Sequence, residues 1–285
     1  MLKENIVNQT ALSKNLPIRA EKIVNQSGTL RKISAIARNT FREAVRDRVL
    51  YNLVLFVLLI TAAAIFLGEL TAGQEARVIV NFGLSAMLLF GAFISIFVGI
   101  GLVSKEIEKR TVFAIFAKPI GRGEFLVGKY FGLCLTLAAN VAVMSAGLLL
   151  ALVYVGGSSL AVSVLSAVFL IFLELTILTA VAILFSSFSS PALSALFTFF
   201  VFVIGHSSAA LKDMANHLGT ASAQFFFGAL YYVLPNLSHF SFITAAANGK
   251  TPAFNQLIGG AAYAVVYVSI LLAASVLIFN RRNFK

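Results

Sequence analysis

Glu174 is the one carboxylate that stands in the middle of a long apolar run, in the sequence LIFLELTIL. An ionised acid at the centre of a bilayer costs on the order of 3 kcal/mol on insertion scales. Its side chain is therefore expected to face other helices, a cavity or a partner, where it could handle a proton or a cargo molecule. The alternative is a packing residue, protonated or hydrogen-bonded beside Thr176 or Thr179.

The other residues that could carry chemistry form no catalytic or metal-binding pattern. His206, His217 and His239 are separated by 11 and 22 residues, which matches no metal motif, and no cysteine is near them. Cys134 is the only cysteine, so no internal disulfide can form. The sequence contains no Gly-x-x-x-x-Gly-Lys-Ser/Thr phosphate loop and no Ser-His-Asp arrangement that could be defended. An enzyme is therefore disfavoured.

A charged, amphipathic insert at residues 104–129 separates two apolar runs. Charged residues open it, and apolar residues that include Phe113 and Phe116 supply one side. Pro119 then breaks the helix, and Gly121-Arg122-Gly123 turns the chain back. Apolar side chains in water are a liability unless a groove buries them, so we expect this insert to dock onto a partner as a helix in a groove. A loop at the membrane surface would explain the charges but not the two phenylalanines together.

Residues 30–49 predict a second amphipathic element. Apolar residues, Phe41 among them, recur at helical spacing, while Arg38, Arg42 and Arg46 form an i, i+4 stripe on another face. We expect a helix in the headgroup plane, with the arginines toward anionic lipid or a partner. The alternative is a solvated basic face on a helix that packs against protein.

These elements are positioned by a chain that is apolar enough to be embedded in a membrane. Its residues are 59% hydrophobic and only 12% charged, whereas ordinary soluble domains are about 25% charged. Six apolar runs of at least 19 residues occupy 50–68, about 78–103, 125–155, 160–186, 191–211 and 256–279. About 20 helical residues cross a bilayer core of about 30 Å. The prediction is an all-α polytopic membrane protein with six transmembrane helices.

Residues 225–247 test that count, because Pro235 divides them into halves of 10 and 12 residues. Each half is about half a bilayer long as a helix. We expect an outer re-entrant hairpin at 221–247, covered by protein as part of the bundle because broken backbone at membrane depth needs such cover. A kinked seventh span is the alternative.

The net charge of +11 is unevenly spread. Residues 1–49 carry ten Lys and Arg, 104–129 carry six and the tail carries three, together 19 of 22. The positive-inside rule predicts that these clusters, and both termini, are cytosolic. The charge is therefore a topology signal rather than a sign of nucleic-acid binding. Residues 1–29 show no apolar signal segment and are expected to be a cytosolic extension.

Glycine and serine also recur along the second apolar run, at Gly83, Gly91, Ser95 and Gly99. Small residues on one face of a helix allow a neighbouring helix to approach closely. The pattern fits either a seam between two copies or packing within one chain.

The insert carries an ordered pattern: an acidic pair and a threonine, a proline, an arginine, then Gly-Lys. The residues are Glu106, Glu108, Thr111, Pro119, Arg122, Gly128 and Lys129. With it, residues 30–285 resemble a permease of the exporter-type second class of ABC transporters (ABC-2 type), similar to those of copper-enzyme-maturation and gliding-motility systems. Residues 30–49 resemble that family's connecting helix, Leu234-Pro235-Asn236 its outer re-entrant element and Phe279-Asn280-Arg281-Arg282 its closing basic tail. Arg110 departs from the pattern, since a glycine commonly precedes the threonine.

The resemblance implies a transmembrane domain at 30–285 whose loop 104–124 holds a coupling helix. Two copies, or this chain and a close relative, would pair on two ATP-binding subunits in a bacterial inner membrane. ATP and Mg would bind those subunits, and this chain would bind no cofactor or metal. ATPase coupling is assigned to Glu106, Glu108, Arg110, Thr111, Phe113, Phe116, Pro119, Arg122 and Lys129, with Arg38, Phe41, Arg42 and Arg46 on the connecting helix. Glu174 is the candidate for a translocation path, and Pro235 and Asn236 form the re-entrant element.

Two rival functions remain from the sequence. Within the family, the chain could transmit ATP-driven movement to outer partners without moving cargo. From another class, it could be a stand-alone carrier or channel with Glu174 as its ion-coupling group. Copurification separates these, because only an ABC permease should bring down an ATPase.

Overall fold

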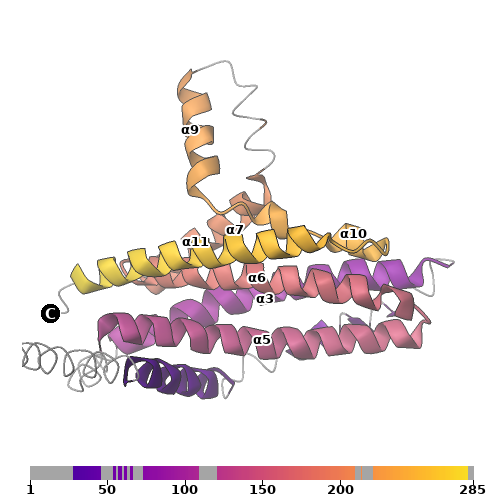
Figure 1. Ribbon diagram of the computed structural model, residues 1–285, viewed down its shortest axis with the longest axis horizontal. Coiled ribbons are helices and arrows are strands. Elements are labelled where there is room, and N and C mark those ends of the chain that lie inside the picture. The colour runs from indigo at the N-terminus through magenta and orange to yellow at the C-terminus, as the bar shows by residue number, and fades with distance from the viewer. Residues whose placement is uncertain are drawn as a thin grey trace, which may run out of the picture.

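The computed structural model describes residues 28–45, parts of 54–66, 73–108, 121–208, 213 and 221–281. Four long helices run side by side: α3 (Glu75–Glu108), α5 (Arg122–Tyr154), α6 (Ala161–Ser186) and α11 (Phe254–Arg281) (Figure 1). Each is long and apolar enough to cross a membrane. At about 1.5 Å per residue, even the 26 residues of α6 exceed the hydrocarbon thickness. The described chain is helical, as predicted.

Helix α6 is the centre of this bundle. It packs against α3, α5, α7 (Pro191–His206) and α11, and its apolar side chains are distributed around the whole circumference, as expected of a helix surrounded by protein. Gly91 of α3 leaves room for Leu175 of α6, because a Cβ at Gly91 would lie 2.5 Å from a Leu175 methyl group. Gly83 does the same for Leu148 of α5. The small-residue face of α3 thus serves packing within one chain.

Helix α7 is shorter than the sequence predicts. It begins at Pro191, in the position after the N-cap residue Ser190, but the Ser190 side chain makes no capping hydrogen bond. It ends at His206 after 16 residues, about 24 Å, whereas the apolar run continues to residue 211. Helix α7 alone is therefore shorter than the hydrocarbon core of a bilayer.

The segment around Pro235 is broken, as predicted. Helix α9 (Ala221–Val233) ends two residues before the proline, and the short helices η2 (Leu237–Phe240) and α10 (Ile243–Ala247) follow it. η2 and α10 pack against α6. Helix α9 instead projects from the bundle at a steep angle to the long helices (Figure 1) and exposes Phe225 and Phe226. The expectation that the hairpin is part of the bundle therefore holds for its second half and is wrong for α9.

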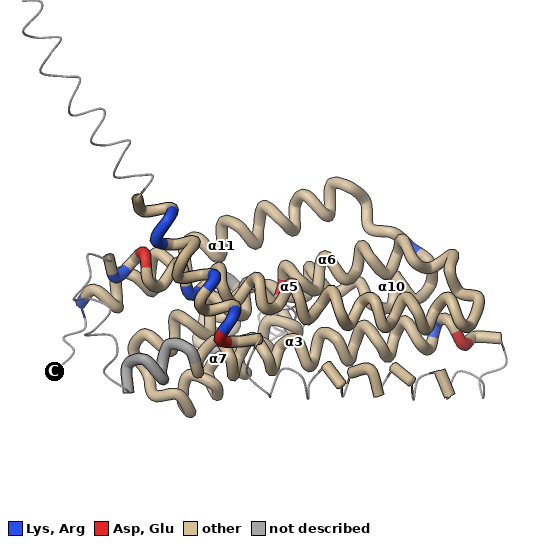
Figure 2. Tube along the Cα trace, turned by 90° about the horizontal axis from the view of Figure 1, so that it is seen from below, with Lys and Arg blue, Asp and Glu red and all other residues tan. Residues whose placement is uncertain are grey.

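Basic residues gather at one end of the bundle. This end, here called the basic end, holds the helix at residues 28–45, the start of α5 and the end of α11 (Figure 2). Within the described ranges, only Arg77 and Lys250 place a basic residue toward the opposite end. Residues 109–120, with Arg110, Thr111, Phe113, Phe116 and Pro119, lie outside the described residues, as do Arg46 and residues 1–27. They join or flank elements of the basic end.

Candidate functional site

The helix at 28–45 is seated on α5 at two glycines. A Cβ at Gly128 would lie 2.8 Å from the Cβ of Ile36, and one at Gly132 would lie 2.7 Å from the carbonyl oxygen of Ala37. Two glycines four residues apart form a groove on one face of α5, where another backbone can approach closely. The apolar face of this helix therefore packs against protein, which is the alternative that the sequence left open.

Two ion pairs join the same two helices. The Lys129 ammonium group lies 3.6 Å from the Glu43 carboxylate, and Lys32 lies 3.7 Å from Glu124. Glu124 also accepts a hydrogen bond from the backbone N–H of Gly121, so it closes the first turn of α5. Lys129 is only 2% exposed, whereas the Glu43 side chain is 48% exposed. The buried Lys129 ammonium group therefore needs its partner more than the half-exposed Glu43 carboxylate does.

Because the two partners differ in burial, we expect their removal to lower the stability of the protein by different amounts. Glu43→Ala would weaken the support of a buried ammonium group and should destabilise the protein by about 1–2 kcal/mol. Lys129→Met should cost less, because Glu43 can be hydrated and the methionine fills the same space. Thermal unfolding of the purified full-length chain in detergent measures both. A larger loss for Lys129→Met than for Glu43→Ala would contradict the assignment.

Arg122 ties the start of α5 to the end of α11. Its guanidinium group donates hydrogen bonds to the carbonyl oxygens of Phe279, at 3.2 Å, and Asn280, at 3.1 Å. These carbonyls lack partners within their own helix, and a cation there also matches the negative end of the helix dipole. The rings of Phe125 and Phe279 stack beside this contact. The helix at 28–45, α5 and α11 therefore form one connected junction at the basic end.

The structure places the predicted coupling residues in different environments. Arg122 and Lys129 lie inside the junction, where they hold helices together. Arg38 and Arg42 are exposed on the helix at 28–45, and Phe41 is partly buried there. Glu106 and Glu108 lie in the last turns of α3, but their side chains are outside the described part. The glycine groove was the feature that sequence reasoning missed, although Gly128 was in the family pattern and Gly132 follows it by four residues.

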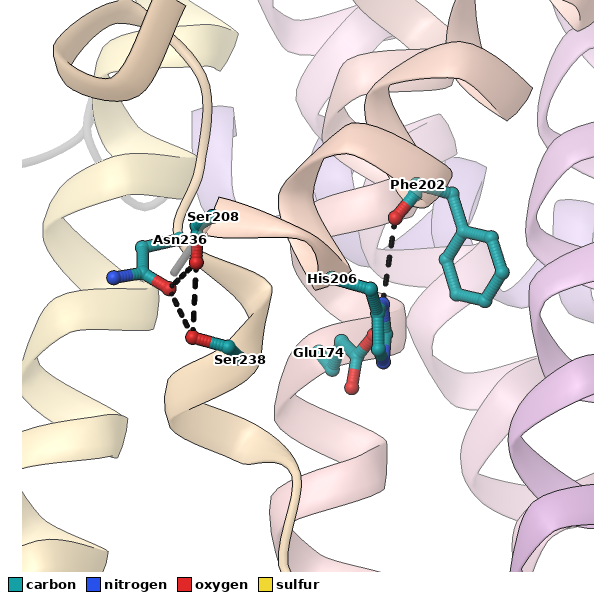
Figure 3. Close-up of polar contacts among 6 residues, drawn as sticks. All are labelled: Glu174, Phe202, His206, Ser208, Asn236 and Ser238. Atoms are coloured by element: carbon teal, nitrogen blue, oxygen red, sulfur yellow. Dashed lines mark hydrogen bonds and ion pairs between the residues drawn. The ribbon is translucent and has the colours of Figure 1, made fainter. Parts of the chain in front are cut away.

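Glu174 lies in the bundle interior, where the structure brings it against a histidine. Oε1 of Glu174 is 3.4 Å from Nδ1 of His206, the last residue of α7 (Figure 3). The same Nδ1 lies 3.3 Å from the carbonyl oxygen of Phe202. The Glu174 side chain is 1% exposed and that of His206 27% exposed. The sequence did not pair them, because 32 residues separate them and neither forms part of a motif.

The segment at Pro235 and Asn236, which was predicted to be re-entrant, is held by a second polar group near the end of α7. The Asn236 side-chain oxygen accepts hydrogen bonds from Ser208 and Ser238 (Figure 3), and its backbone N–H donates to the hydroxyl oxygen of Tyr263. Tyr267 donates to the carbonyl oxygen of Val233. Pro235 is buried against α7, where a Cβ at Gly205 would lie 2.8 Å from its carbonyl oxygen. The i, i+4 spacing of Tyr263 and Tyr267 on α11 is the sequence signal that could have indicated these contacts.

No metal centre is formed within the part of the chain that the structure describes, since no three His, Cys, Asp or Glu residues come together there.

Comparison with known proteins identifies the family of this chain. The sequence model for the ABC-2 family transporter proteins matches residues 34–284. The chain belongs to the ABC-2 transporter family. A search of curated proteins finds no match. This ABC-2 family chain is a multi-pass membrane protein of a permease class whose members typically have no catalytic site and work with an ABC ATPase subunit.

Proposed function

We propose that this chain is the permease subunit of an ABC exporter, built from two permease copies and two ATP-binding subunits in a bacterial inner membrane. Both termini and the basic end would face the cytosol, in keeping with the charge distribution. ATP and Mg would bind the partner ATPase. The six-span topology, with 50–68 as the first span and α7 as the fifth, is part of this proposal.

The junction at the basic end is the observation that carries the proposal. The loop that joins α3 to α5 lies between Glu108 and Arg122, so a force on that loop acts directly on the start of α5. The glycine groove transfers movement of α5 to the helix at 28–45, and Arg122 transfers it to α11. A partner that grips one loop would therefore move three helices together. The exposed Arg38 and Arg42 give the partner a second contact.

The coupling role of the loop follows from the same mechanics. Glu106, Glu108, Arg110 and Thr111 would set its charge, and Phe113 and Phe116 would enter a groove on the ATPase. Pro119 would end the coupling helix before α5. The cargo would pass along the seam between α6 and α7 when these helices part, and Glu174 would then line the path. The hairpin around Pro235 and Asn236 would close the outer side.

Copurification tests the proposal. The full-length chain, affinity-tagged and extracted from its own host's membranes in mild detergent, should bring down a phosphate-loop ATPase in stoichiometric amount. Lipid vesicles that contain the complex should hydrolyse ATP. A chain that is isolated alone, and that moves solute down an ion gradient without ATP, would be a stand-alone carrier and would contradict the proposal.

A further inference from the structure

Three buried polar atoms belong to the Glu174–His206 pair at the seam between α6 and α7. Both carboxylate oxygens of Glu174 and Nε2 of His206 are buried, and the one polar contact that any of them makes among the described residues is the 3.4 Å approach of His206 Nδ1 to Oε1. Each of these atoms is buried from solvent. Figure 3 shows the two side chains facing one another where α7 ends. Unpartnered polar atoms in such a place are costly, so the arrangement calls for a ligand or a charge state that relieves the cost.

The positions of the oxygens fix one hydrogen. Nδ1 of His206 lies 3.3 Å from the Phe202 carbonyl oxygen and 3.4 Å from Oε1 of Glu174. A lone pair on Nδ1 would face two oxygens, so we assign a hydrogen to Nδ1, from which it donates to the Phe202 carbonyl oxygen while Oε1 of Glu174 lies beside it as an ion-pair partner. With that hydrogen alone, the pair would carry a full negative charge inside the bundle. One more proton, on Nε2 or on the Glu174 carboxyl group, makes the pair neutral overall.

The proton is the ligand that fits this space. The side-chain oxygens of Glu174 are buried from solvent, so a cargo molecule could reach them only if the helices around them moved apart. A metal ion needs four or more ligand atoms in most protein sites, and the described residues bring no third His, Cys, Asp or Glu to the pair. A proton needs only the two groups that are present.

No neighbouring charge replaces that proton among the described groups. Titratable side chains on the elements around α6 are those of α3, α5, η2 and α11; α10 has none, and α7 has only His206. Lys129 is paired with Glu43, Lys32 with Glu124, and Arg122 binds the end of α11. The remaining groups are Glu75, Arg77, Tyr130, Cys134, Tyr154, His239, Tyr263, Tyr267 and Arg281. Tyr130 donates to the Thr176 carbonyl oxygen, and Tyr263 and Tyr267 serve the hairpin.

We propose that Glu174 and His206 form a proton-binding site that holds one proton in addition to the Nδ1 hydrogen and keeps the α6–α7 seam closed. Release of the proton leaves an anion in an apolar space, which must gain water or another partner. The seam therefore opens more readily when the pair is deprotonated. The site is defined by the geometry of the pair, and it does not depend on which substrate the complex transports.

Imidazole and carboxyl spectroscopy on the full-length chain in lipid nanodiscs tests this directly. The chain has three histidines, so ¹⁵N labelling of histidine gives few signals, and His206→Asn identifies that of His206. At about pH 7, where an exposed histidine is largely neutral, the wild-type chain should show one of two states. Either His206 is an imidazolium, or an infrared band of a protonated carboxyl group disappears in Glu174→Gln.

The variants supply the cross-checks. In Glu174→Gln, His206 should be neutral, because the carboxylate that stabilises a second imidazole proton is gone. In His206→Asn, Glu174 should show the protonated carboxyl band. Exchange of sodium for potassium in the buffer should change neither spectrum.

Three results would overturn the proposal. One is a neutral His206 beside an ionised Glu174 in the wild type, and another is an imidazolium that persists in Glu174→Gln. The third is a spectrum that follows the sodium concentration. These outcomes are independent of transport and of ATPase binding, so failure here leaves the permease assignment standing.

Discussion

Gly132→Ala is expected to detach the helix at 28–45 from α5 and to abolish the coupling of ATP hydrolysis to transport. The added Cβ would lie 2.5 Å from the Cβ of Thr40 and 2.7 Å from the Ala37 carbonyl oxygen. A backbone oxygen cannot turn away as a side chain can, so the helices must separate. Overpacking of this kind costs about 1–3 kcal/mol, and we expect a value near the upper end, measured as thermal stability of the purified chain.

Gly259→Ala is the matched control, because a Cβ at Gly259 in α11 meets nothing within 4 Å. It should cost no stability, since alanine favours a helix more than glycine does. Thr40→Gly added to Gly132→Ala should restore only part of the loss, because the Ala37 carbonyl remains. If Gly132→Ala is as stable and as active as Gly259→Ala, the groove does not hold the two helices together.

Replacing both Phe113 and Phe116 with alanine is expected to uncouple the complex while the chain still inserts into the membrane. Truncating a buried aromatic anchor costs about 2 kcal/mol or more of binding free energy, so the double change, about 4 kcal/mol if the two add, should weaken binding of the ATPase by roughly a thousandfold. Transport should fall accordingly, whereas the ATPase subunit keeps its own nucleotide site. Transport and ATP hydrolysis are measured side by side in the same vesicles.

Phe199→Ala with Phe200→Ala is the control for that experiment. These two phenylalanines also stand among apolar residues, but they lie on the outside of α7, where Phe199 is 40% exposed and Phe200 is 49% exposed. Their loss should leave the ratio of transport to ATP hydrolysis unchanged. Normal transport by the Phe113/Phe116 variant would show that the loop is not the contact through which force reaches the permease.

The fold was predictable where one helix could be recognised by itself. Uniform apolarity over more than 20 residues indicates a membrane helix regardless of its neighbours, which is why α3, α5, α6 and α11 were found. The end of α7 was not predictable, because the apolar run continues beyond His206, where the helix ends. The direction of α9 depends on tertiary contacts in the same way.

The candidate site could be predicted only in part, for the same reason. Arg122, Lys129 and Glu174 drew notice because charged side chains are rare in this chain, but their partners could not be derived. Arg122 binds carbonyl groups, which every residue has, so no sequence pattern identifies Phe279 and Asn280 as its acceptors. The Glu174–His206 pair depends on the relative register of two helices, and that register is set by packing rather than by spacing along the chain.

The central place of α6 bears on how the protein is made. As the ribosome delivers the helices in order, α6 enters the bilayer before α7 and α11 exist to cover it, and Glu174 then has no histidine beside it. Helix α6 is the most apolar of the four long helices, which offsets the insertion cost of one acid, on the order of 3 kcal/mol. His206 arrives with the very next helix. Biogenesis thus leaves the acid without its partner for no longer than the synthesis of a single helical hairpin.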